Sequence, residues 1–157
     1  GLNVSFKTVC KIPSVISNNY SINIILGSAF GKKSPLKNIS NGIFVEIKIR
    51  IACKLELPED IEELAIYVLS GKLNYNNKII QAGEMLILNS AKDFFLDAYE
   101  NCHCILLGGD VVNESRYLWW NFVSSEMELI ENAKKNWLNK KFKMPVDDYK
   151  DFIPLPN

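Results

Sequence analysis

The sequence predicts an all-β domain, built as an antiparallel sandwich or barrel and followed by one helix near the C-terminus. Two observations support this. About eight short apolar segments recur at near-regular spacing, with turn-forming residues between them. The apolar residues then change to helical spacing after residue 124. At 157 residues the chain is long enough to bury a core, and we expect one domain over residues 1–157.

Charge and hydropathy argue against several classes of function. The 18 basic and 18 acidic residues cancel and form no run of one sign, so the chain has no basic surface for DNA or RNA. No apolar segment approaches the roughly 20 residues of a membrane-spanning helix. The start also lacks the charged and apolar regions of a signal peptide. We predict a cytoplasmic protein with no nucleic-acid and no membrane partner.

The first expected elements are two strands and a loop. Residues 6–12 mix apolar and polar side chains and stop at Pro13, which is typical of an edge strand or of an irregular arm that leads into the first strand. Residues 20–30 form a long β-prone run, in which Gly27 indicates a bulge or a bend. Residues 31–35 are expected to form a loop.

The clearest strand covers residues 43–51. Apolar and polar side chains alternate there with the two-residue period of a strand, so one face is buried and the other is mostly wet. Residues 57–63 carry Pro58 and four acidic residues, and they are expected to form a loop. The side chains predicted to be buried are Ile43, Val45, Ile47, Ile49 and Ile51.

Further short strands complete the β-region, which we place at about residues 4–112. Asn76 and Asn77 are expected to form a hairpin turn, because asparagine tolerates positive φ. The predicted strands are residues 64–69, 72–75, 78–80, 84–88, 93–99 and 102–107.

A helix is predicted over about residues 124–139, and an irregular tail over residues 140–157. Ser125 and Glu128 have the spacing of a capping box, in which the serine hydroxyl accepts from the backbone of Glu128 and the carboxylate reaches back. The predicted apolar stripe is Met127, Ile130, Ala133 and Trp137.

Side-chain contacts are expected to support this helix and the tail. Glu131 and Lys135 lie one helical turn apart and are predicted to pair on the wet side. Phe152, Ile153 and Leu155 are available to anchor the tail.

Few side chains of the β-region could bind a ligand. Cys102 and Cys104 share a face of a predicted strand, where they could form a redox pair; we favour small apolar fillers of a reduced core. His103 points to the opposite face, which argues against a Cys-His-Cys metal site and favours an ordinary histidine. A pocket lined by Tyr67 and the two cysteines is a further hypothesis. Acidic residues that could form a cation site, although a solvated loop is favoured, are Glu56, Glu59, Asp60, Glu62 and Glu63.

Trp119 and Trp120 lie side by side and could form a ligand platform or a binding hot spot. We favour packing, with one ring in the barrel and its neighbour covering the other side of the strand; an interface is the second choice. The sequence contains no phosphate-binding glycine loop, GxSxG elbow or HExxH motif, and no residue is assigned a catalytic role.

Residues 116–125, with the sequence RYLWWNFVSS, form a distinctive segment ahead of the predicted helix, and FIPLP follows at residues 152–156. Between them stand Ile130, Ala133, Lys134, Trp137 and Phe142. Together these residues resemble the C-terminal end of bacterial pirin-like proteins. Residues 25–31 and 106–109 lie where that family has similar segments.

The resemblance implies a cupin-like double-stranded β-barrel (jelly roll) with one C-terminal α-helix and an irregular tail. The family has two cupin barrels in tandem, and this chain is similar to the second alone. Family members hold their metal in the first barrel, through three histidines and a glutamate. Leu64 stands where metal-binding cupins usually carry a glutamate, and Leu86 where a later histidine falls. Because His103 is the only histidine, a multi-histidine site within the chain is excluded, and we expect no metal and no other cofactor.

Two hypotheses of function follow from the resemblance. The first is a metal-free binding or interaction module that is not catalytic by itself. Its partner would be a second copy, forming a homodimer, or a separate N-terminal pirin barrel. The second is the metal-free half of an enzyme similar to quercetin 2,3-dioxygenase, which opens flavonols with a metal and dioxygen. The candidate pocket or interface residues are Tyr67, Cys102, Cys104, Trp119 and Trp120.

Overall fold

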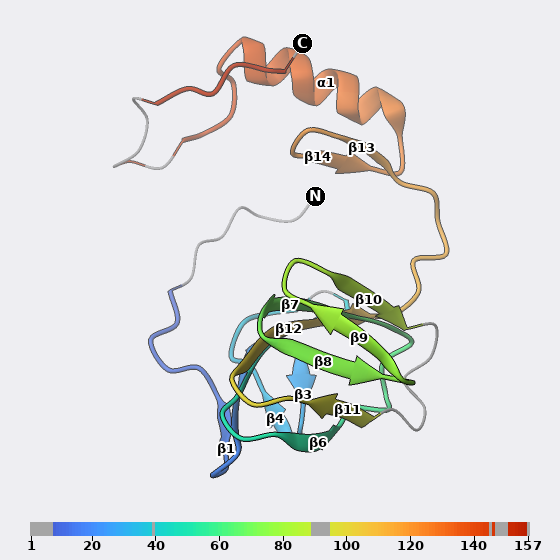
Figure 1. Ribbon diagram of the computed structural model, residues 1–157. Coiled ribbons are helices and arrows are strands. Elements are labelled where there is room, and N and C mark those ends of the chain that lie inside the picture. The colour runs from blue at the N-terminus through green and yellow to red at the C-terminus, as the bar shows by residue number, and fades with distance from the viewer. Residues whose placement is uncertain (1–7, 39, 89–94, 145, 147–150, 157) are drawn as a thin grey trace. The chain divides into compact units, whose positions relative to one another are not determined.

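The structure is a computed structural model that describes residues 8–38, 40–88, 95–144, 146 and 151–156 (Figure 1). It divides into two units, which we call the sheet unit (Gly1–Val111) and the C-terminal unit (Val112–Asn157).

The sheet unit contains a six-stranded antiparallel sheet, the larger sheet. Alternation in the sequence explains its sidedness, because every second side chain of its central strands is buried. The predicted strand at residue 43 is confirmed, with its isoleucines and valine in the core. In spatial order the strands are β1 (Ser14–Ile16), β2 (Tyr20–Leu26), β5 (Ile43–Ile49), β12 (Cys102–Gly109), β7 (Glu63–Ser70) and β10 (Met85–Leu88).

A four-stranded antiparallel sheet, the smaller sheet, faces the larger one (Figure 1). The inward side chains of the two sheets form one hydrophobic core. Among the described residues the sheets share no continuous ladder, so the expected barrel takes the two-sheet form of a jelly roll. The strands of the smaller sheet, in order, are β6 (Cys53–Glu56), β11 (Phe95–Ala98), β8 (Lys72–Tyr75) and β9 (Lys78–Gln81).

Two turns follow their predicted chemistry. Asn76 and Asn77 both have positive φ, 48° and 64°, and close the β8–β9 hairpin as expected. The pairing of β2 with β5 shifts register before Leu26, and Gly27 then turns the chain at φ +78° into a short hairpin. A side chain on Gly27 would meet the carbonyl oxygen of Gly42 at 2.3 Å, so the close approach requires glycine. The hairpin consists of β3 (Ser28–Ala29) and β4 (Lys32–Lys33).

Several expected boundaries of the sheet unit are wrong. The first strand begins at Ser14, and residues 8–12 ahead of it are irregular, so of the two alternatives for this segment they form the lead-in arm and not an edge strand; residues 6–7 lie outside the described part. Strand β5 ends at Ile49, so Ile51 is 56% exposed instead of buried. Residues 32–33 of the expected loop pair as a strand. Residues 93–94 of a predicted strand lie outside the described residues.

The C-terminal unit is a hairpin packed against a helix. Strands β13 (Tyr117–Trp119) and β14 (Phe122–Ser124) form the hairpin, and α1 (Met127–Leu138) contacts both. The predicted helix is confirmed, with Ile130 buried, but it begins at Met127, three residues later than expected. No described helix has the length and apolar character needed to cross a bilayer.

Two predicted helix contacts are wrong. Glu126 is the N-cap residue of α1 and has no side-chain cap, so the expected capping box at Ser125 does not form. Instead the hydroxyl of Ser124 accepts from the backbone N–H of Glu126 at 3.1 Å. Glu131 pairs with Lys134 at 2.6 Å and not with Lys135, because Lys134 also lies over the ring of Trp119.

Candidate functional site

The outward face of the larger sheet combines a polar half with an apolar half. The strand registers place side chains from distant parts of the sequence in two parallel rows across this face. One row runs through Asn23, Glu46, Ile105, Tyr67 and Met85. The other runs through Phe44, Leu107, Ala65 and Ile87.

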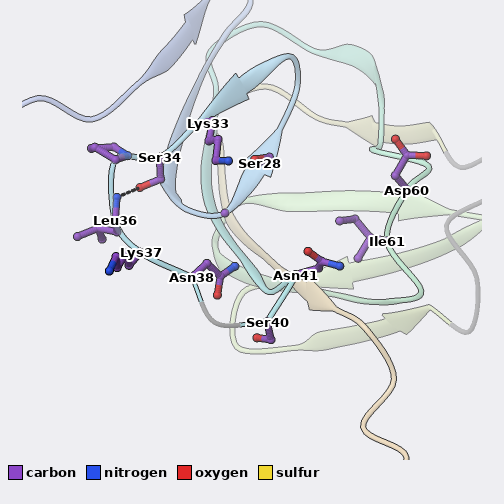
Figure 2. A pocket seen from close by; sticks show the side chains of 12 residues that line it. Ser28, Lys33, Ser34, Leu36, Lys37, Asn38, Ser40, Asn41, Asp60 and Ile61 are labelled. Carbon is purple, nitrogen blue, oxygen red and sulfur yellow. Dashed lines mark hydrogen bonds between the residues drawn. The ribbon is translucent and has the colours of Figure 1, made fainter. Parts of the chain in front are cut away.

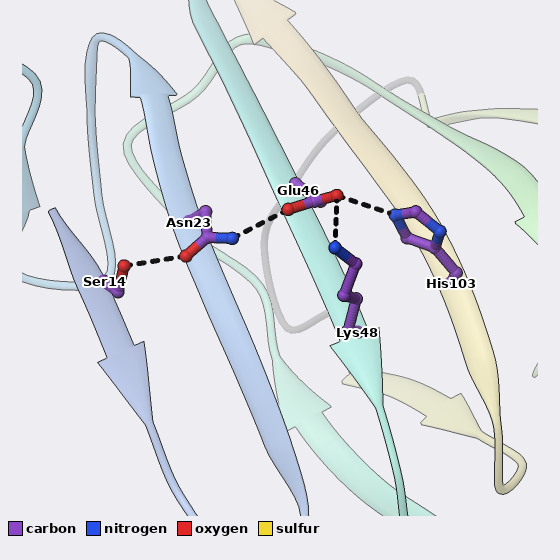
Figure 3. A network of polar contacts seen from close by, with 5 residues as sticks. All are labelled: Ser14, Asn23, Glu46, Lys48 and His103. Atoms are coloured by element: carbon purple, nitrogen blue, oxygen red, sulfur yellow. Dashed lines mark hydrogen bonds and ion pairs between the residues drawn. The ribbon is translucent and has the colours of Figure 1, made fainter. Parts of the chain in front are cut away.

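The polar half is a hydrogen-bond network centred on Glu46 (Figure 3). One carboxylate oxygen lies 2.8 Å from the amine of Lys48 and 3.0 Å from Nε2 of His103. The other accepts from the Asn23 amide at 2.7 Å, and Ser14 donates to the same amide group at 2.7 Å. His103 is therefore an ion-pair partner on the surface, in line with the ordinary role favoured for it.

The network lowers the pKa of Glu46. The hydrogen bond from Lys48 is the main cause; partial burial opposes it, and Asn23 and His103 add further stabilisation of the carboxylate. Because the folded pKa lies below the unfolded one, Glu46 contributes stability above the unfolded pKa and loses it as pH falls through the folded pKa.

Glu46→Gln is expected to lower the free energy of unfolding at neutral pH by less than about 1 kcal/mol, since the network is open to solvent. At a pH below the folded pKa, where the native carboxyl is protonated, the difference is expected to vanish within roughly the error of the measurement. Urea unfolding at both pH values checks this. Glu56→Gln is the matched control, because Glu56 is exposed on β6 and has no ion pair among the described residues. An equal loss at both pH values would contradict the account.

The apolar half of the face, which we call the apolar half-face, lies on β5, β12, β7 and the outermost strand β10. Ile87 is 71% exposed and Met85 is 51% exposed, although both belong to a sheet. Tyr67 and Leu107 beside them are half-buried. Exposed apolar side chains gathered on one side of a sheet are typical of a surface that contacts another protein. The apolar half-face consists of Phe44, Ala65, Tyr67, Met85, Ile87, Ile105 and Leu107.

The structure separates Tyr67 from the two cysteines. Cys102 and Cys104 are buried on the inner face of β12, whereas Tyr67 pairs with Ile105 on the outer face. A single pocket lined by all three is therefore not formed. Both thiols are free, and the hydrogen bond with Cys102, together with burial, raises the pKa of Cys104. The two cysteines lie among the core residues, as the favoured interpretation expects.

Trp119 and Trp120 belong to an aromatic cluster inside the C-terminal unit. Their rings meet edge-on at 6.4 Å, Trp120 meets Trp137 at 5.1 Å, and Trp119 stacks on Phe122 at 6.3 Å. Packing was the favoured interpretation, but the two rings pack against the same cluster and do not cover opposite sides of a strand. Trp120 has a positive φ of 51°, which is rare for a bulky residue, and the ring contacts hold it there.

The positions expected to lack metal ligands are occupied by packing side chains. Leu64 is 2% exposed in the core, and Leu86 packs against that core. Among the described residues, no group of three or more His, Cys, Asp and Glu is arranged to hold a metal. One residue of the acidic loop has a partner elsewhere in the sheet unit: the Glu62 carboxylate accepts a hydrogen bond from the backbone N–H of Val111 at 2.9 Å.

Solved structures share the fold of this chain. Quercetin 2,3-dioxygenase from Acinetobacter baumannii matches with a TM-score of 0.82 and 21% identity, over 94% of this chain and 50% of that chain. The protein GK1651 from Geobacillus kaustophilus matches with a TM-score of 0.56 and 24% identity, over 66% of this chain and 45% of that chain. At these identities the likeness shows the fold alone.

The sequence comparisons identify the family. Residues 44–143 match the family described as the Pirin C-terminal cupin domain. A pirin-like protein of Caulobacter vibrioides is 30% identical over 146 residues, which are 93% of this chain and 50% of that protein. The chain belongs to the pirin family and corresponds to its C-terminal cupin domain. It spans about half the length of the curated relative that it matches.

Proposed function

We propose that this domain is a metal-free interaction module whose apolar half-face packs against the first cupin barrel of a pirin-type assembly. The observation that carries the proposal is the exposure of Met85 and Ile87 on the outermost strand of the larger sheet. Since the chain spans half of its relative, the other half supplies a partner of suitable size and fold. We prefer this partner to a second copy of the chain.

The side chains at the cupin ligand positions support a role without a metal. A leucine that packs in the core cannot coordinate an ion, and Leu64 is such a residue. His103 is held on the outer face by Glu46, away from the core where a cupin ligand set would converge. On this proposal, any metal chemistry belongs to the partner barrel.

A second candidate is the metal-free half of a flavonol-cleaving enzyme. It is favoured by the fold shared with the quercetin 2,3-dioxygenase of Acinetobacter baumannii over 94% of this chain. In that case this chain would shape or close a site that the first barrel carries. Metal analysis of the purified chain, together with quercetin turnover by the mixed halves, separates the two candidates. Turnover only in the mixture would favour the second, and stoichiometric iron, copper or nickel in this chain alone would overturn both.

Ile87→Asp is expected to weaken binding to the first-barrel half by at least about tenfold, because it places a charge in an apolar contact. The probe is the half of the Caulobacter vibrioides pirin-like protein that this chain does not cover, and light scattering on the mixture gives the mass of the complex. Ile79→Asp is the matched control, since Ile79 is a 40% exposed isoleucine on the edge strand of the smaller sheet.

The same measurement distinguishes the possible occupants of the face. A complex of both halves that Ile87→Asp weakens and Ile79→Asp preserves supports the proposal. A homodimer weakened by Ile87→Asp would assign the face to a second copy. No association at all, or equal effects of both substitutions, would overturn the apolar half-face as a docking surface.

A further inference from the structure

A polar pocket of about 660 Å³ lies on the sheet unit, apart from the apolar half-face. It is formed by the β3–β4 hairpin, the segment that leads from it to β5, and residues 60–61 of the acidic loop (Figure 2). Its volume is in the range of small-molecule sites. Side chains with amine, hydroxyl, amide and carboxylate groups border it, so an apolar ligand is not its natural occupant.

Hydrogen bonds within the protein order the segment around Ser34 that forms one wall of the pocket. Ser34 is 5% exposed, and its hydroxyl donates to the carbonyl of Ile25 at 2.7 Å and accepts from the backbone of Leu36 at 3.2 Å. The backbone N–H of Ser34 donates to the carbonyl of Gly27 at 2.8 Å. A wall that is already ordered reduces the entropic cost of binding.

The amide groups of the pocket are oriented by neighbours. The side-chain NH₂ of Asn41 donates to Asp110 at 2.8 Å, and that of Asn38 donates to the carbonyl of Gly42. One N–H of each amide is thus engaged, which orients the amide group and makes its oxygen available as an acceptor for a ligand that carries hydroxyl groups.

The charged groups of the pocket have an excess of one positive charge. Lys33 and Lys37 border it, and Asp60 is the one carboxylate among its lining residues. Within the described part of the chain, none of the three forms an ion pair, so both amines are available to a ligand anion. Charge-assisted hydrogen bonds from lysine amines to a carboxylate are among the stronger polar contacts.

We infer that this pocket binds a small hydroxylated organic carboxylate. A lysine amine of the pocket border, from Lys33 or Lys37, pairs with the carboxylate, and the ligand's hydroxyl groups donate to Asp60 and to the amide oxygens of Asn38 and Asn41. This site is independent of the proposed contact with a first barrel, and its test does not depend on that contact.

Titration of the full chain with sodium gluconate, followed by backbone amide shifts in NMR spectra, tests the inference. Shifts at residues 28–41 and 60–61 are expected to saturate. Sorbitol lacks the charge, hexanoate lacks the hydroxyl groups, and inorganic phosphate is an anion without the carbon chain; each is expected to bind at least about tenfold more weakly.

The double substitution Lys33→Ala and Lys37→Ala is expected to weaken gluconate binding by about tenfold or more. Lys32→Ala is the matched control, because Lys32 lies on the same hairpin, is exposed and does not line the pocket. An unchanged amide spectrum outside the pocket shows that the variants fold.

Three results would overturn the inference. The first is no saturable shift with gluconate. The second is binding of phosphate or hexanoate as tight as that of gluconate, which would reduce the pocket to a general anion site. The third is an equal effect of Lys32→Ala and of the double substitution.

Discussion

Leu64→Glu is expected to lower the free energy of unfolding of the sheet unit by about 3–5 kcal/mol at neutral pH. The side chain of Leu64 is 2% exposed in the core, and the described residues offer no cation there to pair with a carboxylate. Burial raises the pKa of such a carboxyl, so the cost grows as pH rises above the unfolded pKa. Denaturant unfolding at neutral pH and near pH 4 is the measurement, with a smaller loss expected at the lower pH.

Ala65→Glu is the matched control for this substitution. Ala65 is the next residue of β7 and lies on the outward face, where a carboxylate keeps its contact with water. Its cost is expected to stay below about 1 kcal/mol. Equal losses for the two variants would mean that position 64 is not a packing position. A Leu64→Glu variant of full stability would contradict the account of Leu64 as a core residue.

Trp137→Ala is expected to lower the free energy of unfolding of the C-terminal unit by about 3 kcal/mol. It is also expected to remove most of the helical circular dichroism signal of α1. Trp137 is the centre of the aromatic cluster, with ring centroids 5.1 Å from Trp120, 5.9 Å from Phe142 and 5.4 Å from Phe152. Its indole N–H also donates to the carbonyl of Ile153 at 2.9 Å, which ties the tail to the helix. Far-ultraviolet circular dichroism, recorded during thermal unfolding, measures the loss.

Trp137→Phe separates the ring from its hydrogen bond. It keeps an aromatic ring in the cluster and removes only the donor to Ile153, so a loss of about 1 kcal/mol is expected. Unfolding of the sheet unit should be unaffected by either substitution, because the ring contacts of Trp137 lie within the C-terminal unit. Full retention of helix signal in Trp137→Ala would contradict the account.

The strands and turns could be predicted where the alternation of apolar residues or the turn residues determine the local structure. Alternation fixed the buried face of β5, and two asparagines identified the β8–β9 turn. The prediction extended β5 to Ile51, because the pattern continues there. In the structure the backbone N–H groups of Arg50 and Ile51 both donate to the carbonyl of Asn19, and the chain leaves the sheet. That contact comes from the turn between β1 and β2, more than 30 residues away in the sequence, so local pattern could not reveal it.

The start of α1 and the β13–β14 hairpin before it were predicted less well, because contacts that the sequence pattern does not show decide both. Ser124, not Ser125, accepts the hydrogen bond from Glu126, so the expected capping box does not form. The β13–β14 hairpin was not predicted, because its turn contains Trp120, a bulky residue that rarely adopts positive φ. Ring contacts across the C-terminal unit override that preference.

Neither proposed surface could be predicted from the sequence. The apolar half-face joins side chains of β5, β7, β10 and β12, and only the strand order brings them into two rows. The polar pocket combines Lys33 and Lys37 with Asp60, which belongs to a different loop. Taken alone, each of these residues is an ordinary surface residue. The positions of Leu64 and Leu86, by contrast, could be compared with cupin metal-ligand positions, because a family motif marks those positions.

Hydrogen exchange of this chain, alone and mixed with the first-barrel half of the Caulobacter vibrioides pirin-like protein, tests the central claim most directly. The account predicts slower exchange in the mixture for peptides that cover β7 and β10, which carry much of the apolar half-face, and no change for β9 in the smaller sheet. Protection confined to the smaller sheet, or no protection anywhere in the sheet unit, would contradict it.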